Sequence, residues 1–92
     1  MKFEHEKLGK CVLTDLTQKR LEDLTREMQG KEKETLTVFR GDSVRIAIKL
    51  GILTEPEMTF DDVDEAKPSL IHWLADCIGE LIAEALNIDP LS

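Results

Sequence analysis

The last two dozen residues contain the longest amphipathic segment of the chain, and its pattern limits what the chain can fold into. In LIHWLADCIGELIAEALNI (70–88), aliphatic side chains recur at helical spacing and fill one half of a helical wheel. The other half carries three carboxylates, Asp76, Glu80 and Glu84. A membrane-spanning helix needs about 20 mostly apolar residues with few or no charges, so these carboxylates exclude one. The segment therefore predicts an amphipathic core helix over about 68–88, with Pro68 in its first turn.

Two further helices are predicted upstream of this segment. LTQKRLEDLTREMQG places Leu and Met at helical spacing between a possible N-cap at Thr17 and a terminating Gly30, which predicts a helix over 17–29. GDSVRIAIKLG predicts a shorter helix over 43–50, capped by Asp42 or Ser43. We expect both helices to pack on the C-terminal one.

The remaining segments suggest a small amount of β structure. TLTVF (35–39) alternates apolar and polar residues and is the strongest candidate strand, and residues 1–13 suggest a short strand or hairpin. Residues 54–67 read as an acidic loop with one helical turn near 62–66. Together these patterns predict a mainly α, small α+β fold in which 1–92 is a single domain packed around the C-terminal helix, with a short N-terminal β element.

The charge of the chain is distributed unevenly. Residues 1–50 hold 11 basic and 9 acidic side chains, whereas residues 51–92 hold 1 basic and 10 acidic ones, so charges of +2 and −9 make up the net −7. Binding to a nucleic-acid backbone needs clustered Lys and Arg, so we expect no nucleic-acid partner. The acidic half could instead bind a basic peptide or a second, basic surface.

Sequence motifs for catalysis or for cofactor and metal binding are weak. His72 with Asp76, Glu80 and Glu84 forms an i, i+4 stripe, but no second cluster completes the three or four ligands that zinc requires. DDVDE (61–65) lacks the alternating spacing of a calcium loop. RGDS (40–43) matches a cell-adhesion tetrapeptide, and we interpret it as a turn followed by an N-cap. We therefore expect a non-enzymatic protein without a cofactor or metal.

Two cysteines and the first residues bear on the compartment. Cys11 and Cys77 are far apart in the sequence, and the charged start MKFEHEKLGK does not resemble a signal peptide. This combination predicts reduced, buried thiols and a cytoplasmic protein.

The C-terminal helix also supplies the candidate protein-binding residues. Half a helical circumference of aliphatic side chains is more than one small helix pair covers, which suggests surplus apolar surface for a partner or for a second copy. Trp73 could anchor such an interface or lie at the rim of the core. The predicted interface residues are Trp73, Leu74, Ile78, Leu81, Ile82 and Ala85.

The order of these segments resembles a known class of proteins. A short β-like start running into LTDLTQKRLEDL, then RGDSVRIAIKLGIL, then a Trp-bearing helix ending in EALNIDP, is similar to small accessory proteins of tailed phages and prophages, and most closely to tail-assembly chaperones. The resemblance implies a small helical protein that binds a structural protein and keeps it soluble during assembly. The sequence therefore predicts non-catalytic protein binding, either to such a partner or to itself. The alternative is a regulatory module that binds a basic peptide or small ligand through the acidic C-terminal half.

Overall fold

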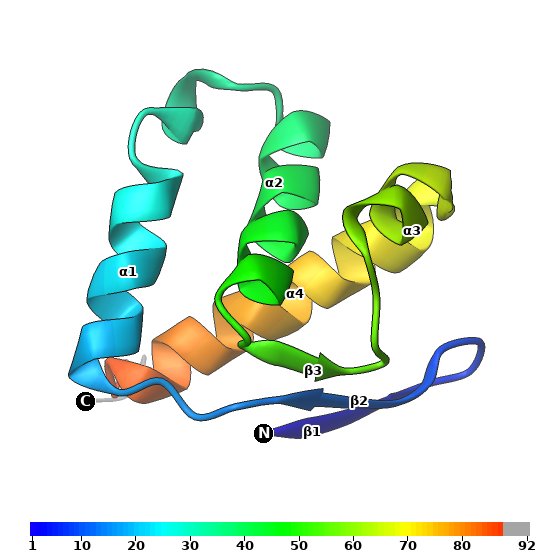
Figure 1. Cartoon of the computed structure of the whole chain (residues 1–92), viewed down its shortest axis with the longest axis horizontal. Coiled ribbons are helices and arrows are strands. Elements are labelled where there is room, and N and C mark those ends of the chain that lie inside the picture. Colours follow the sequence, from blue (N-terminus) through cyan, green and yellow to red (C-terminus); the bar gives the residue numbers. More distant parts are fainter. Residues whose placement is uncertain (88–92) are drawn as a thin grey trace.

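A computed structural model of the chain describes residues 1–87. Its elements, in chain order, are β1 (Lys2–His5), β2 (Gly9–Leu13), α1 (Gln18–Met28), the short 3-10 helix η1 (Lys31–Lys33), α2 (Leu36–Lys49), β3 (Leu53–Glu55), α3 (Phe60–Glu65) and α4 (Pro68–Ala85). Figure 1 shows α1 and α2 standing side by side, with α4 crossing them and the sheet below. The predicted mainly α, small α+β fold around a long C-terminal helix is confirmed.

The sheet has the order β1-β2-β3 and is antiparallel throughout. β1 and β2 form a hairpin, one of the two arrangements expected for residues 1–13, and it places His5 opposite Gly9 and Phe3 opposite Cys11. β3 pairs with the other edge of β2, where Leu13 lies opposite Leu53. The sequence analysis did not predict β3 and placed its residues in or beside the acidic loop. Three residues are too few to produce a recognisable alternation, so the pairing with β2 defines this strand.

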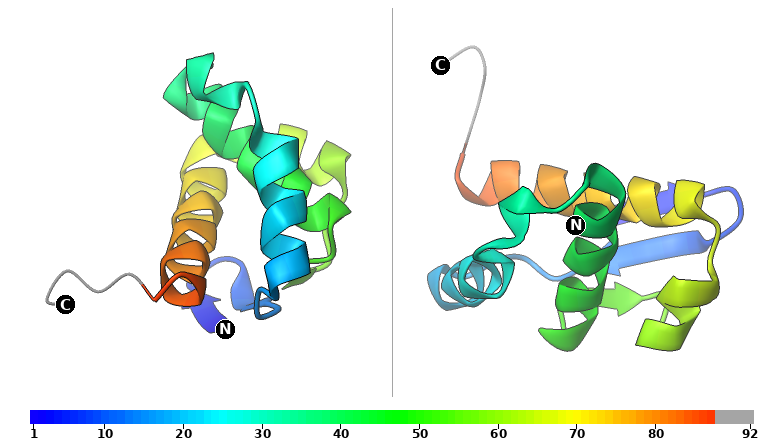
Figure 2. Two further views of the ribbon diagram at one scale, coloured as in Figure 1. Left: turned by 90° about the vertical axis from the view of Figure 1, so that its left-hand side faces the viewer. Right: turned by 90° about the horizontal axis from the view of Figure 1, so that it is seen from above.

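The centre of the core lies where α4 crosses α2 and covers the sheet (Figure 2). α4 buries five side chains at helical spacing: Ile71, Leu74, Cys77, Ile78 and Leu81. They pack with buried residues of α2 and β2, among them Val44, Ala47 and Leu13. The central position of the C-terminal helix is therefore as predicted.

α4 begins at the predicted residue, Pro68, and its helical residues end at Ala85, before the predicted end. Pro68 occupies the first turn, where its missing N–H removes no helical hydrogen bond. The helix ends at Ala85, and Asn87 has a positive φ of 52°, a conformation that commonly terminates helices. The predicted end at Ile88 lies outside the described residues.

The predicted strand over 35–39 is wrong, because these residues form the N-terminal part of α2. The alternation of Leu36 and Val38 does not reflect a buried face, since these side chains are 62% and 48% exposed. Thr35 is the N-cap residue, and the segment continues in register into the helix predicted at 43–50. Alternation over five residues is too short to separate a strand from the start of a longer helix.

The RGDS stretch therefore lies inside a helix and does not precede one. Neither Asp42 nor Ser43 caps it: the Ser43 hydroxyl donates to the carbonyl of Phe39 at 2.9 Å, while Asp42 bonds Lys31 at 3.2 Å and Arg45 at 3.1 Å. Burial alone would raise the pKa of the Asp42 carboxyl, but the hydrogen bonds and the nearby cationic groups outweigh it and hold that pKa below its ordinary value. The glycine that looked like a turn signal makes room for the guanidinium of Arg45.

The acidic segment after β3 contains a helix, as the predicted turn suggested. α3 begins with a capping box, in which the Thr59 hydroxyl accepts from the Asp62 amide at 3.2 Å and the Asp62 carboxylate accepts from the Thr59 amide at 2.8 Å. Asp64 pairs with Arg45 of α2. The carboxylates of DDVDE thus cap α3 and tie it to α2.

Candidate functional site

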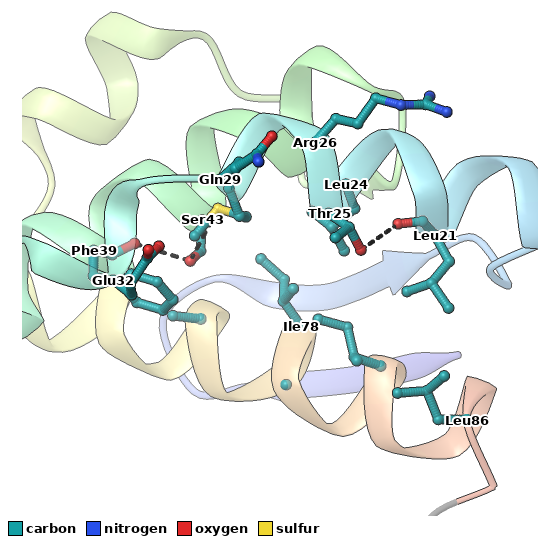
Figure 3. A pocket seen from close by; sticks show the side chains of 14 residues that line it. Leu21, Leu24, Thr25, Arg26, Gln29, Glu32, Phe39, Ser43, Ile78 and Leu86 are labelled. Atoms are coloured by element: carbon teal, nitrogen blue, oxygen red, sulfur yellow. Dashed lines mark hydrogen bonds between the residues drawn. The ribbon is translucent and has the colours of Figure 1, made fainter.

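An apolar groove with a volume of about 680 Å³ lies between α1 and α4. We call it the α1–α4 groove. The upper end of α2 closes it through Phe39 and Ser43. Its apolar lining comes chiefly from Leu21, Leu24 and Met28 of α1 and from Ile78, Ile82 and Leu86 at the other wall. In Figure 3, Leu21 extends from α1 toward Ile78 and Leu86 across the open space.

The groove exists because α1 packs mainly on α2 and leans away from the C-terminal half of α4. Leu24 is the buried residue of α1, and Glu27 pairs with Lys49 of α2 at 2.9 Å. Thr17 begins α1 as predicted, its hydroxyl accepting from the Arg20 amide at 3.2 Å. The other apolar residues of α1 therefore face α4 without being fully covered: Leu21 and Met28 are half-buried.

The six predicted interface residues lie in different environments. Leu74, Ile78 and Leu81 are buried at 1%, 3% and 2% exposure, so they belong to the core, and of these three Ile78 also lines the α1–α4 groove. The correction has a simple cause: α2 and the sheet cover this face of α4 more completely than the sequence pattern suggested. Ile82 is half-buried and lines the α1–α4 groove, whereas Ala85 is exposed beside a smaller hollow near Leu16.

Trp73 packs within the chain, on the side of α4 that faces β1. It is half-buried, and its ring meets His5 edge-on at 4.6 Å and Phe3 at 6.2 Å between centroids. These contacts agree with its interpretation as a residue at the rim of the core. They attach the N-terminal hairpin to α4.

The α1 wall of the groove, Gly79 of α4 and Leu86 just after α4 were not predicted from the sequence. Leu21 and Met28 were expected on the packing face of their helix. They remain only half-buried because α1 does not pack closely against α4. Leu86 was counted with the core face, yet it is 51% exposed. The one residue in the sequence that could have pointed to the groove is Gly79, because glycine weakens a helix and is unusual in the middle of a long one.

Gly79 lies on the wall of the groove and has no structural reason within the chain to be glycine. It is exposed, its φ is not positive, and a Cβ built on it would meet nothing within 4 Å. Glycine inside a helix costs about 1 kcal/mol relative to alanine. With Ala75 and Ala83 at i−4 and i+4, it gives α4 a strip of small side chains beside the groove. Such a strip lets another helix approach closely.

A second hollow of about 370 Å³ lies between α2, α3 and the start of α4. Arg45, Asp64 and His72 supply its ionisable side chains, and the Nε2 atom of His72 is buried without a hydrogen-bond partner among the described residues. Arg45 and Asp64 are already paired with each other. Within residues 1–87, no three His, Cys, Asp or Glu side chains gather as metal ligands would.

Both cysteines are buried free thiols, as expected. Burial raises the pKa of the Cys77 thiol to about 11, and the nearby charges of Glu80 and Asp76 and the Cys11 thiol act in the same direction. Burial and Glu4 also raise the pKa of Cys11. An activated thiol needs the opposite shift, so neither cysteine has the environment of a nucleophile.

These pKa shifts predict slow thiol chemistry in the folded protein. At pH 8 a Cys77 thiol with a pKa of about 11 is almost entirely protonated, so its reaction with iodoacetamide should be about two orders of magnitude slower than in guanidinium. Because the folded state holds this proton more tightly than the unfolded state, stability should be unchanged up to about pH 8.5 and should fall as the pH rises toward 11. Mass spectrometry of the alkylated protein measures the rate. A thiol that reacts in the folded state as fast as a free cysteine would contradict this assignment.

Within residues 1–87, no helix combines the length and the apolar character that crossing a membrane requires. Comparisons of the chain with models of protein families, with curated proteins and with solved structures give no match. The functional argument therefore rests on the α1–α4 groove.

Proposed function

We propose that this protein is a non-catalytic protein-binding protein that holds a helical segment of a partner in the α1–α4 groove. One observation carries the proposal: Leu21, Met28 and Ile82 are only half-buried, and together with the exposed Leu86 they line one continuous hollow of about 680 Å³. Apolar side chains gathered in one concave surface are typical of an interaction site.

The shape of the groove suits a helix. From Ala75 to Leu86 the axis of α4 advances about 16 Å, which matches about three turns of a second helix laid along it. Docking of an amphipathic helix between two existing helices is a common mode of peptide recognition, and it places apolar side chains at i, i+3, i+4 and i+7 in the groove. Covering this surface would contribute binding free energy at about 25 cal/mol per Å² of apolar area removed from water.

Non-catalytic protein binding is also what the resemblance to phage tail-assembly chaperones implies. A protein of that class would use the groove to cover an apolar segment of a structural protein until assembly. A second copy of the chain is a further possible occupant. The groove supports the proposal that a protein segment binds there, whichever partner supplies that segment.

A second candidate function is the binding of an apolar small molecule. The groove volume of about 680 Å³ favours it, because small-molecule sites commonly measure about 300–1,000 Å³ and are mostly apolar. Native mass spectrometry of the freshly purified protein would reveal such a ligand as a fixed added mass. The protein-binding proposal predicts the mass of the chain alone.

Site-specific photocrosslinking in the cells that make this protein tests the main proposal. A photoreactive amino acid at Gln29, an exposed residue on the groove wall, should join the chain to a discrete protein partner. The same amino acid at Glu57, an exposed residue between β3 and α3, serves as the control. The substitution Ile82→Gln should abolish the Gln29 product. Equal products from both positions, or none from Gln29, would contradict binding in the groove.

A further inference from the structure

We infer that the occupant of the α1–α4 groove is an amphipathic helix whose apolar stripe is flanked by basic side chains. This inference rests on the proposed function and identifies the chemistry of the partner. Its basis is the charge around the groove, where, among residues 1–87, Arg26 is ion-paired and the carboxylates of Glu32 and Glu80 are not.

On the α1 wall the cation is already engaged. Arg26 lies 3.4 Å from Glu22 and 3.3 Å from Asp23, measured between guanidinium nitrogens and carboxylate oxygens. In Figure 3 its guanidinium points away from the groove. Arg26 therefore offers little unpaired positive charge to an acidic ligand.

Two carboxylates lie on or near the groove. Glu32 of η1 lines the groove at its Phe39 end, whereas Glu80 follows Gly79 in α4 and does not itself line the groove. Both side chains are exposed, and within residues 1–87 neither forms an ion pair. Asp76, one turn before Glu80, is paired only loosely, at 3.6 Å from Arg40. A helix lying over Gly79 would thus have Glu80 on its α4 side and Glu32 at one end of the groove.

The same charges argue against a second copy of this chain. In a two-fold contact centred on Gly79, Glu80 would lie near Glu80 of the other copy, since a symmetric interface brings each residue close to its own equivalent. Two bodies of net charge −7 would also repel each other. A helix with Lys or Arg beside an apolar stripe meets neither obstacle, and its charges complement Glu32 and Glu80.

The test compares two designed, fluorescein-labelled peptides of about 18 residues that share one Leu stripe at helical spacing. One has Lys on both flanks of the stripe and the other has Glu. Fluorescence anisotropy at about 50 mM NaCl should show the Lys peptide binding at least about tenfold more tightly, with the difference shrinking at about 500 mM NaCl. The double substitution Glu32→Gln with Glu80→Gln should weaken the Lys peptide by about three- to tenfold.

A matched control separates local charge from net charge. Glu55→Gln with Glu57→Gln removes the same total charge at exposed positions near β3 and should change binding by less than about twofold. Equal effects of the two double substitutions would overturn the inference, as would equal binding of the two peptides or a dimer in sedimentation equilibrium. If the Glu peptide binds as well as the Lys peptide and Ile82→Gln abolishes both, the charge inference fails while groove binding stands. If neither peptide binds and the Gln29 crosslink is absent, both proposals fail.

Discussion

Leu74→Ala is expected to lower the free energy of unfolding by about 2–5 kcal/mol, the range for removing a buried leucine and leaving a cavity. Leu74 is 1% exposed at the place where α4 crosses α2. A chain of this size has a total stability of only about 5–14 kcal/mol, so the loss should be large enough to leave part of the variant unfolded at 37 °C.

Chemical denaturation followed by circular dichroism measures this loss against a matched control. Leu86→Ala removes the same atoms from the same helix, but its side chain is 51% exposed. The control should therefore cost about 0.5 kcal/mol or less. Similar losses for the two variants would contradict the assignment of Leu74 to the core and of Leu86 to the groove.

Gly79→Gln is expected to act oppositely on stability and on binding. In the free protein the new Cβ meets nothing within 4 Å, and replacing a helix-interior glycine should raise the free energy of unfolding by about 0.5 kcal/mol. In the complex the added side chain would occupy the space where the partner helix approaches α4. Affinity for the Lys-flanked peptide should fall by about tenfold or more, the size of effect seen at well-packed interface positions.

Ala85→Gln is the control for this substitution. It adds the same side chain to the same helix at an exposed residue that does not line the α1–α4 groove. Peptide affinity should stay within about twofold of the unchanged protein. A loss of affinity in both variants would indicate that α4 responds to any bulky addition and would remove the argument from Gly79.

The helix periodicity of the sequence was sufficient to predict α4, α1 and the second half of α2, because each carries apolar side chains at helical spacing. It failed at 35–39, where exposed Leu36 and Val38 imitate the alternation of a strand. It also failed at Gly41, which reads as a turn and is instead a buried helical residue beside Arg45. Local patterns describe one element at a time, so they cannot show which side chains of a neighbouring element occupy the same space.

The candidate site was predicted only in part for the same reason. The C-terminal helix was predicted to be the binding element, and two of its named residues, Ile78 and Ile82, line the groove. Leu74, Ile78 and Leu81 lie in the core because α2 and the sheet cover them, which a helical wheel cannot reveal. The α1 wall depends on the angle at which α1 leans away from α4. That angle is set by tertiary packing and has no signature in either helix alone.

The central claim is that the α1–α4 groove is where this protein binds its partner, and an NMR titration tests it most directly. The ¹⁵N-labelled protein is titrated with the Lys-flanked peptide, and the change in each assigned amide signal is recorded. We predict that the largest changes fall on residues 21–29 and 75–86, with small changes in the sheet and α3. Changes concentrated on the sheet and α3, or scattered evenly over the chain, would contradict the claim.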